Sequence, residues 1–557
     1  MTVANWLAAV ARPDAEMRRT LTGLYGPDAD LWRPRLALWR AALERYATRF
    51  GDHEVVLCRA PARLSFNPHS DHQGSFVLYG CHHRELVVVA GASADGRTHL
   101  VNADFSHAQD LAFNLTAEIG RAPVAWRGGW LTYIESPAVK AAVAAAADPK
   151  DRRFGRRGSL NYVRAALLRL EHHHPGRLGG YNLAVAGDIP PAAGLSSSSA
   201  LVVATALAAE ALSGLTLDRA ALTPLLGQAE WYVGTRGGSG DHGAMLLGHR
   251  EGLVNLAFEP PLALRAVRHC RWPAGLGLLL ANCGVRAEKS SAAKRQFNRG
   301  VFAYKFACAE LRRHLAKRDP DLAERTRWLA DFATLPLELV YDLLLALPAQ
   351  MSLAKLGRRY AEGFEALLQS FFDTADPDLL PDAVPLRGAA LYGLGRADRG
   401  RVQDGLLDDG SPTALAEFGH LLNVAHDGDR LFRLSADGAM APCGPQELDD
   451  DSLRAARATQ RPLRLEPGCY GASIAELDRI VDLARGVPGV LGAGLMGAGG
   501  GGVVQILTNN DEAVTAELRQ VLGAGYYGPA GLEPMIECWR PAAEAGQVPA
   551  GGGGVTT

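Results

Sequence analysis

The amino-acid sequence predicts an α+β fold built from two domains, and three observations lead to that prediction. The chain has 557 residues, and length alone would allow about three or four domains. Strand-like and helix-like segments both occur throughout it, without an internal repeat. Four candidate ligand-binding segments lie far apart, around residues 63, 198, 241 and 497. We expect them to meet in one cleft between the two domains, because distant segments can serve one ligand only when folding brings them together.

The elements at the start of the chain are predicted from the spacing of apolar residues. Residues 5–50 have the helical spacing of amphipathic helices. Residues 54–57 and 85–90 are strand-like, and the passage between them, Arg59 to Gly74, is predicted to be rich in loops. The first part of the chain therefore combines helices with a sheet.

The rest of the chain continues this mixture. Further strand-like segments lie at 181–186, 276–282 and 503–507. Helices are predicted at 200–212, at 228–233 and as a helical block over 301–370. An alanine- and glycine-rich loop is predicted at 491–502, directly before the last of these strands.

Composition and charge exclude several classes of protein. Hydrophobic residues make up 48% and charged residues 21%, which is ordinary for a globular chain. The formal net charge of −2 provides no field to attract nucleic acid or an anionic membrane surface. No apolar run reaches the ~18 residues that span a bilayer, and residues 1–20 lack the features of an export signal. The eight cysteines form no CxxC pair, which is typical of reduced thiols and predicts a cytoplasmic location.

A serine-rich loop between a predicted strand and a predicted helix is the first candidate for ligand binding. From Pro191 to Ala200 the sequence is PAAGLSSSSA. The first turn of a helix presents unpaired N–H groups and a partial positive charge, so a phosphate there is stabilised without any lysine. The serine hydroxyls add donors, and one of them could hold a metal ion. The alternative is a serine-capped helix that follows a tight turn.

The segment from Arg59 to Gly74 is the second candidate. It gathers arginine, histidine and aspartate in a passage from a strand to a turn. Carboxylates and imidazoles exchange hydrogen bonds with hydroxyl groups, so this set suits a polyol, and Arg63 can meet a phosphate. The alternative is a polar surface hairpin.

Two further segments complete the set. Glu230 lies on a predicted helix and Asp241 follows a glycine-rich break, so Glu230 could hold Mg²⁺ and Asp241 could accept a proton. Either carboxylate alone is more often a surface acid. Nearer the C-terminus, Gly492 to Gly502 has the sequence GAGLMGAGGGG, whose small residues let the backbone approach a bulky anion.

In this order the segments resemble the motifs of the GHMP kinase superfamily, and within it the galactokinase-like sugar 1-kinases. The serine loop resembles the second family motif, PxxxGLSSS, and Gly492–Gly502 is similar to the third. Arg59–Gly74 stands in the place of the first motif.

Passages outside these motifs narrow the resemblance to galactokinases. Residues 281–286 (ANCGVR) and 297–299 (FNR) resemble the passages A-N-x-x-V-K and Y-N-x-R. Residues 419–422 (GHLL) with His426, and 473–478 (SIAELD), resemble G-x-L-M, S-H and S-x-x-E-L-D. The resemblance extends from about residue 50 to about residue 540, with insertions near 120–158 and 308–390.

The resemblance implies a fold with defined domain bounds. GHMP kinases combine an N-terminal domain like ribosomal protein S5 with a ferredoxin-like C-terminal domain. We therefore expect an N-terminal domain over 1–265 and a C-terminal domain over 266–540, with a helical insertion at about 308–390. Residues 541–557 are expected to form a disordered tail.

The resemblance also implies an activity and its site residues. It implies a cytoplasmic kinase that uses ATP and Mg²⁺ on the anomeric hydroxyl of a small sugar, as a monomer or homodimer. The implied phosphate-binding residues are Gly194, Leu195, Ser196, Ser197, Ser198, Ser199, Gly497, Ala498 and Gly499. Ser198 and Glu230 match the metal ligands, Asp241 the catalytic aspartate and Arg63 the arginine that pairs with it. The implied substrate-binding residues are Asn67, His69, Asp71, Gly238 and Ser239.

The first motif departs from the galactokinase pattern G-R-x-N-L-I-G-E-H-x-D-Y. The run from Arg63 to Asp71 is one residue shorter, and Asn67-Pro68 replaces Gly-Glu. In galactokinases that glutamate reaches an outer hydroxyl of the hexose, so we expect a sugar related to galactose but not identical to it. Near 294–297, a lysine or a phenylalanine stands where galactokinases have a sugar-contacting tyrosine.

Other functions stay open at this point. Asn-Pro followed by Ser-Asp is also similar to the glucuronokinase motif, so an acidic sugar, a heptose or another alcohol is an alternative substrate. A non-catalytic sensor with the galactokinase fold is a further alternative, although the presence of Asp241, Arg63, Glu230 and the serine loop favours a kinase. A dinucleotide-binding protein is excluded, because no GxGxxG follows an early strand with an acidic residue beyond it.

Overall fold

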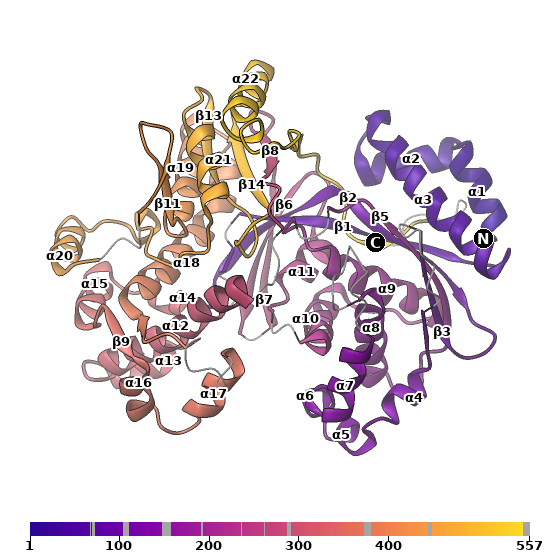
Figure 1. Ribbon diagram of the computed structural model, residues 1–557, viewed down its shortest axis with the longest axis horizontal. Helices are drawn as coiled ribbons and strands as arrows, with labels where there is room; N and C mark the ends of the chain where they lie inside the picture. The colour runs from indigo at the N-terminus through magenta and orange to yellow at the C-terminus, as the bar shows by residue number, and fades with distance from the viewer. Residues whose placement is uncertain are drawn as a thin grey trace.

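The computed structural model describes residues 1–66, 68–69, 73–103, 111–146, 158–190, 193–234, 237–260, 262–286, 291–372, 380–443 and 448–549, with the backbone alone for 291–297 and 370. Figure 1 shows two sheets with helices packed around them, one sheet formed mainly by the first half of the chain and the other by the second half. The sheets are joined where Gln505 donates from Nε2 to the carbonyl of Ser65 at 3.2 Å.

Among the described residues, eight strands form the first sheet, in the order β16-β1-β2-β5-β3-β4, with β6 and β7 continuing from β2. These strands are β1 (Val56–Ser65), β2 (Phe76–Ala92), β3 (Thr98–Asn102), β4 (Leu111–Phe113), β5 (Tyr181–Gly187), β6 (Gly252–Glu259), β7 (Ala263–Arg271) and β16 (Gly546–Gln547). The long strand β2 organises the sheet, because one of its edges pairs with β1 and the other with β6 and then β5.

Helices cover both faces of this sheet, which explains the continuous apolar run along β2. Val87 and Val89 belong to the core beneath the N-terminal helices, whereas Leu86 and Val88 belong to the core beneath α8 and α9. The N-terminal helices are α1 (Val3–Ala11), α2 (Ala15–Tyr25) and α3 (Ala29–Phe50). The others in this half are α4 (Leu115–Ile119), α5 (Pro123–Arg127), α6 (Trp130–Glu135), α7 (Pro137–Ala145), α8 (Ser159–His173), α9 (Ser197–Ser213), α10 (Arg219–Glu230), η3 (Trp231–Val233) and α11 (Gly240–Leu247).

The second sheet has the ferredoxin-like order that the resemblance implies. Its strands are β8 (Gly277–Asn282), β13 (Val490–Leu495), β14 (Val503–Thr508) and β15 (Ile536–Cys538), all antiparallel, in the order β13-β14-β8-β15. Helix α21 (Ala475–Arg485) precedes β13, and α22 (Glu512–Leu522) with η6 (Gly523–Tyr527) connects β14 to β15. This is the β-α-β-β-α-β arrangement, with further helices inserted between β8 and α21.

All but one of the inserted helices share an apolar core with the second sheet, whereas buried apolar side chains of α19 belong to the core of the first sheet. In chain order, the inserted helices are α12 (Ser291–Ala316), α13 (Pro320–Arg325), α14 (Leu329–Phe332), α15 (Leu337–Ala346), α16 (Leu353–Arg359), α17 (Phe364–Phe371), α18 (Leu386–Asp409), α19 (Pro412–Asp427), α20 (Asp450–Ala458) and η5 (Leu463–Leu465). Two short hairpins accompany them, β9 (Gln350–Ser352) with β10 (Ala383–Pro385) and β11 (Phe432–Leu434) with β12 (Met440–Pro442). The predicted α+β fold, with its helical insertion, is confirmed.

Strand β1 corrects one prediction, because the expected loop-rich passage is a strand as far as Ser65. The polar residues that indicated a loop are buried within it. Arg59 donates to Glu85 at 2.5 Å, and Arg63 donates to Asp241 at 2.6 Å. Each arginine is tolerated inside the sheet because a carboxylate compensates its charge, so the alternative of a polar surface hairpin is wrong. A similar difference occurs later in the chain, where the start of the predicted glycine-rich loop belongs to β13.

The C-terminal end provides a second correction. Residues 541–557 are predicted to be a disordered tail, but those up to 549 are placed against the first sheet. Gly546 and Gln547 form β16 beside β1, and Val548 is 1% exposed and donates its N–H to Leu57 at 2.8 Å. This segment supplies backbone partners to what would otherwise be an exposed sheet edge. The remainder of the predicted tail, 550–557, lies outside the described residues.

The predicted domain boundary also falls at a different place in the structure. Strand β7 extends to Arg271 and pairs with β6 along its whole length, so a boundary at 265/266 would divide one hairpin. The hairpin is a single hydrogen-bonded unit, and β8 of the second sheet begins only at Gly277. Among the helices of the described ranges, none has both the length and the apolar character that crossing a membrane requires. The eight cysteines are present as free thiols in the structure.

Candidate active site

A carboxylate, an arginine and a serine from three separate elements meet beside the serine loop. Asp241 lies in the first turn of α11, and Arg63 of β1 donates from Nε to its Oδ1 at 2.6 Å. Ser196 donates its hydroxyl to Oδ2 of the same carboxylate. Arg63 also donates to the carbonyl of Gly194, which ties it to the serine loop.

The environment keeps Asp241 ionised. Burial alone would raise the pKa of this carboxyl, but the charge of Arg63 and the hydrogen bonds from Arg63 and Ser196 outweigh it. The pKa of Asp241 therefore lies below its ordinary value. The side chain of Asp241 is 33% exposed while that of Arg63 is 8% exposed, so the carboxylate is accessible and its partner is not. An ionised, accessible and oriented carboxylate is suited to accept a proton.

The position of Asp241 depends on a close contact at the start of α11. A Cβ atom on Gly240 would lie 2.0 Å from the hydroxyl oxygen of Tyr79 on β2, so only glycine lets the helix begin here. Ser239, predicted to bind substrate, is 1% exposed and donates its hydroxyl to the carbonyl of Leu262 at 2.8 Å. This hydrogen bond of the Ser239 side chain therefore holds the start of α11 in place.

The serine loop enters α9 through a left-handed residue. Ser196 has φ 60°, a conformation that is rare outside glycine, and the helix begins at the next residue, Ser197. The first turn of α9 thus consists of serines, with Leu195 buried beneath it. The N-terminal turn of this 17-residue helix carries the partial positive charge that favours a phosphate.

Glu230 accepts a hydrogen bond from Ser199, the neighbour of the serine that the resemblance assigns to the metal. Ser199, 1% exposed, donates its hydroxyl to Oε1 of Glu230 at 2.8 Å, whereas Ser198 was expected to share a metal ion with that carboxylate. Nε2 of His242 lies 3.8 Å from the same oxygen. Ser198 is half-buried on the adjacent position of the helix. The sequence pattern treats the four adjacent serines alike, so it does not predict which partner Ser196 or Ser199 has.

The glycine loop of the second sheet lies against the serine loop. A Cβ atom on Gly497 would lie 3.1 Å from the carbonyl oxygen of Gly194, and one on Gly502 would lie 2.7 Å from that of Ala193. Gly497 and Gly499 both have φ 79°, so the loop also requires their conformational freedom. Backbone from the two halves of the chain therefore surrounds one region, as predicted, with Ala498 exposed between the glycines.

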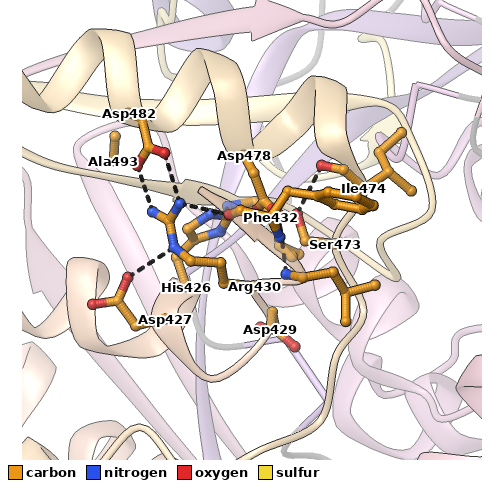
Figure 2. Close-up of polar contacts among 12 residues, drawn as sticks. His426, Asp427, Asp429, Arg430, Phe432, Ser473, Ile474, Asp478, Asp482 and Ala493 are labelled. Carbon is orange, nitrogen blue, oxygen red and sulfur yellow. Dashed lines mark hydrogen bonds and ion pairs between the residues drawn. The ribbon is translucent and has the colours of Figure 1, made fainter. Parts of the chain in front are cut away.

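A buried polar network holds the strand that leads into the glycine loop (Figure 2). His426 of α19 accepts a hydrogen bond at Nδ1 from the N–H of Leu495 at 3.2 Å, and its Nε2 lies 3.0 Å from Asp478 of α21. Asp478 also accepts from the N–H groups of Leu431 and Phe432. The two galactokinase-like passages that contain His426 and Asp478 thus meet behind the glycine loop.

The predicted substrate residues are placed only in part. His69, with φ 67°, lies with its ring stacked on Tyr470 at a centroid distance of 4.5 Å. Gly238 lies just before α11. Asn67 and Asp71 lie outside the described residues. Tyr470 is a residue that sequence reasoning did not select, because it lies before the SIAELD passage and matches none of the quoted motifs.

Comparison with known proteins shows which family models match this chain. The family model "GHMP kinases N terminal domain" matches residues 161–249, and the model "GHMP kinases C terminal" matches residues 449–527. The first match includes the serine loop, Glu230 and Asp241, and the second includes α21 and the glycine loop. Both family models therefore match this chain, and its predicted resemblance to this superfamily is confirmed.

Galactokinases are among the proteins that this chain resembles in sequence. The chain is 30% identical over 156 residues to the galactokinase of Dictyostelium discoideum, which covers 28% of this chain and 30% of that protein. It is 29% identical over 197 residues to the galactokinase of Roseiflexus sp. (strain RS-1), which covers 35% of this chain and 41% of that protein. The matches thus span less than half the length of these curated relatives.

A solved structure extends the likeness over nearly the whole fold. The crystal structure of Lactococcus lactis galactokinase complexed with galactose has a TM-score of 0.57 and 20% sequence identity. The match covers 90% of this chain and 97% of that chain. At this level of identity the comparison shows that the two proteins share a fold.

Proposed function

We propose that this protein transfers the γ-phosphoryl group of ATP to the anomeric hydroxyl of a monosaccharide related to galactose. The observation that carries the proposal is the meeting of Asp241, Arg63 and Ser196 beside two loops suited to phosphate. An oriented, ionised carboxylate and a phosphate cradle are the two parts that a sugar kinase requires.

In the proposed reaction Asp241 is the general base. As the sugar oxygen forms its bond to the γ-phosphorus, its proton passes to the Asp241 carboxylate, and the bond from the γ-phosphorus to the leaving oxygen of ADP breaks. Arg63 favours the ionised form of Asp241 before transfer. Its guanidinium also offsets negative charge near the transferred group, because it lies between the base and the serine loop.

The serine and glycine loops are proposed to hold the triphosphate. The phosphate-binding residues are those of the serine loop, Gly194 to Ser199, together with Gly497, Ala498 and Gly499. Backbone N–H groups at the start of α9 and in the glycine loop are donors of the kind that cradle phosphates. Because phosphoryl transfer has a loose transition state, positioning by these amides contributes much of the rate.

The donor set around Glu230 fits Mg²⁺. A carboxylate and serine hydroxyls are hard oxygen ligands, and Mg²⁺ is usually held by one or two such groups together with substrate phosphates and water. We propose Glu230 and Ser198 as the ligands, with Ser199 orienting the Glu230 carboxylate. When bound, the metal would neutralise charge on the β- and γ-phosphates.

The acceptor side is proposed to select a sugar that differs from galactose at its outer carbon. Asn67, His69, Asp71 and Gly238 are the proposed substrate residues, with Ser239 contributing through its backbone. Asn67-Pro68 in place of Gly-Glu removes a carboxylate acceptor from this pocket. An amide can both donate and accept, so it is compatible with a carboxylate, an extended chain or no substituent on the sugar. The proposal includes a cytoplasmic location, where ATP is supplied.

A coupled assay of ADP release tests this function directly. Wild-type protein with Mg²⁺–ATP is assayed against galactose, galacturonate, glucuronate, arabinose and a heptose, with Asp241→Asn as the matched inactive control. We expect ADP release that depends on one of these sugars and is lost in the control. Sugar binding without ADP release in the wild type would contradict the kinase and favour a sensor.

A further inference from the structure

His69, one of the proposed substrate residues, belongs to an aromatic stack to which the proposed mechanism gives no role. The rings of His69 and Tyr470 are stacked, with centroids 4.5 Å apart and an interplanar angle of 23°. Tyr392 also stacks on Tyr470, with ring centroids 5.0 Å apart and an interplanar angle of 23°. His69 follows β1 of the first sheet, whereas Tyr470 precedes α21 beside the second sheet. The stack therefore links the predicted substrate segment to the other half of the molecule.

The far end of this stack is anchored in the core. The hydroxyl of Tyr392 donates to Asp429 at 2.9 Å, and Arg396 forms an ion pair with the same carboxylate at 2.5 Å. Tyr392, Arg396 and Asp429 are all essentially without solvent exposure. Because this buried pair is compensated and hydrogen-bonded, Tyr392 has one defined position from which it supports its neighbour.

Tyr470 itself is confined by backbone as well as by rings. It is 5% exposed, and its N–H donates to the carbonyl of Gly428 at 2.8 Å. On another side lies α12, where a Cβ atom on Gly300 would come within 2.2 Å of the Tyr470 ring. Gly300 directly follows the FNR passage at 297–299. The ring of Tyr470 thus occupies a slot whose walls are His69, Tyr392 and α12.

His69 is the member of the stack that needs support. Its φ of 67° is in the left-handed region, which residues other than glycine occupy only when the surrounding structure holds them there. The neighbouring ring of Tyr470 is flat, rigid and anchored, so it can select one orientation of the imidazole. An imidazole that recognises a hydroxyl must be held in place, because a small displacement weakens the hydrogen bond.

We propose that Tyr470 is a positioning residue for the acceptor: its ring holds His69 in the conformation that binds the sugar. The inference rests on the proposed function, since it assigns a role within the same site. The proposed role concerns the binding of the sugar alone. Substitution of Tyr470 should therefore change the affinity for the sugar. It should leave the affinity for the nucleotide, which is proposed to bind at the serine and glycine loops, almost unchanged.

Kinetic comparison of three variants tests this role. Tyr470→Leu removes the ring, Tyr470→Phe keeps it, and Phe306→Leu removes another ring from the same core that contacts Phe302, Tyr360 and Phe364. We expect Tyr470→Leu to raise the KM for the sugar about tenfold and to change the KM for ATP by less than about twofold. Tyr470→Phe and Phe306→Leu should resemble the wild type. Equal changes for both substrates, or an unchanged KM for the sugar, would overturn the proposal.

A spectroscopic readout separates this inference from the proposed function. In protein labelled with ¹³C-histidine, the His69 signal is identified by its loss in His69→Gln and then compared among the variants without any substrate. We expect the chemical shift of the His69 signal to change in Tyr470→Leu and to stay the same in Phe306→Leu. If Tyr470→Leu does not fold, Gly300→Ala, which displaces the same ring, takes its place.

The activity assay and the spectroscopic measurement refute different claims. A wild type that phosphorylates none of the sugars refutes the proposed function, while the His69 signal still shows whether Tyr470 holds that ring. A His69 signal that is the same with and without the Tyr470 ring refutes the inference, whatever the kinase activity.

Discussion

Ser196 donates its hydroxyl to the carboxylate of Asp241, so the serine loop and the start of α11 share a hydrogen bond. Arg63 donates to the other oxygen of that carboxylate, and the two neighbours together fix its orientation. The left-handed backbone of Ser196 is what allows its side chain to turn back from the helix that begins at the next residue. The base of the proposed reaction is therefore oriented by the same loop that is proposed to bind phosphate.

Replacing the proposed base should separate chemistry from nucleotide binding. We expect Asp241→Asn to lower kcat by about two to four orders of magnitude, because a general base contributes about that much. The amide keeps the size of the side chain, so the affinity for ATP should stay close to that of the wild type. Single-turnover kinetics and calorimetric titration with ATP measure the two quantities. An unchanged kcat would remove Asp241 from the mechanism.

Removing the positive charge beside the base should change the pH dependence of turnover. Arg63 holds the pKa of Asp241 below its ordinary value, so in the wild type the base stays ionised throughout the neutral range. In Arg63→Gln, burial is no longer outweighed, and the pKa of Asp241 should rise. Turnover should then fall at a higher pH than in the wild type as the solution is acidified. Profiles of kcat against pH that fall at the same pH would contradict this explanation.

Two neighbouring serines can be distinguished by their effect on the metal. We expect Ser198→Ala to raise the Mg²⁺ concentration needed for half-maximal activity, because it removes a proposed ligand. Ser199→Ala should have a smaller effect, because Ser199 acts through Glu230. Titration of activity with Mg²⁺ at saturating ATP compares the two variants. If only Ser199→Ala changes the requirement, the metal ligand is one residue further along the chain.

The altered first motif should make galactose a poor substrate. A hydroxyl left without its partner in a buried site costs about 1–3 kcal/mol, which corresponds to roughly ten- to two-hundred-fold in kcat/KM. We therefore expect kcat/KM for galactose to be lower by such a factor than for a sugar with a different outer carbon. Comparing kcat/KM across the sugar panel checks this. A clear preference for galactose would show that the Asn67-Pro68 replacement does not affect selectivity.

The network behind the glycine loop should make the fold sensitive to acid. Burial lowers the pKa of His426 below its ordinary value, so the unfolded chain binds protons more readily than the folded chain as the pH falls. The free energy of unfolding should therefore decrease between about pH 7 and about pH 5, and less steeply in His426→Gln. Urea denaturation at several pH values measures both slopes. Equal slopes would mean that His426 does not contribute to the acid sensitivity.

The motifs predicted the fold and the meeting of Arg63 with Asp241, because they depend on local chemistry. A glycine and several serines between a strand and a buried helix specify a loop and a helix start wherever they occur, and α9 begins within that segment. The prediction failed where polar residues were interpreted as a loop. Arg59 and Arg63 are buried in β1 because Glu85 and Asp241, which are distant in the sequence, compensate them.

The sequence by itself determined the resemblance of this protein to the GHMP kinases, the position of its two loops and the type of residue available at its candidate site. Only the tertiary structure decided which serine meets Glu230, which meets Asp241, and that Tyr470 lies against His69. Adjacent serines are chemically identical, so a sequence pattern cannot distinguish them, whereas the direction of each side chain on α9 does. The contact of Tyr470 with His69 depends on how the two halves of the chain pack, and no local pattern encodes that packing.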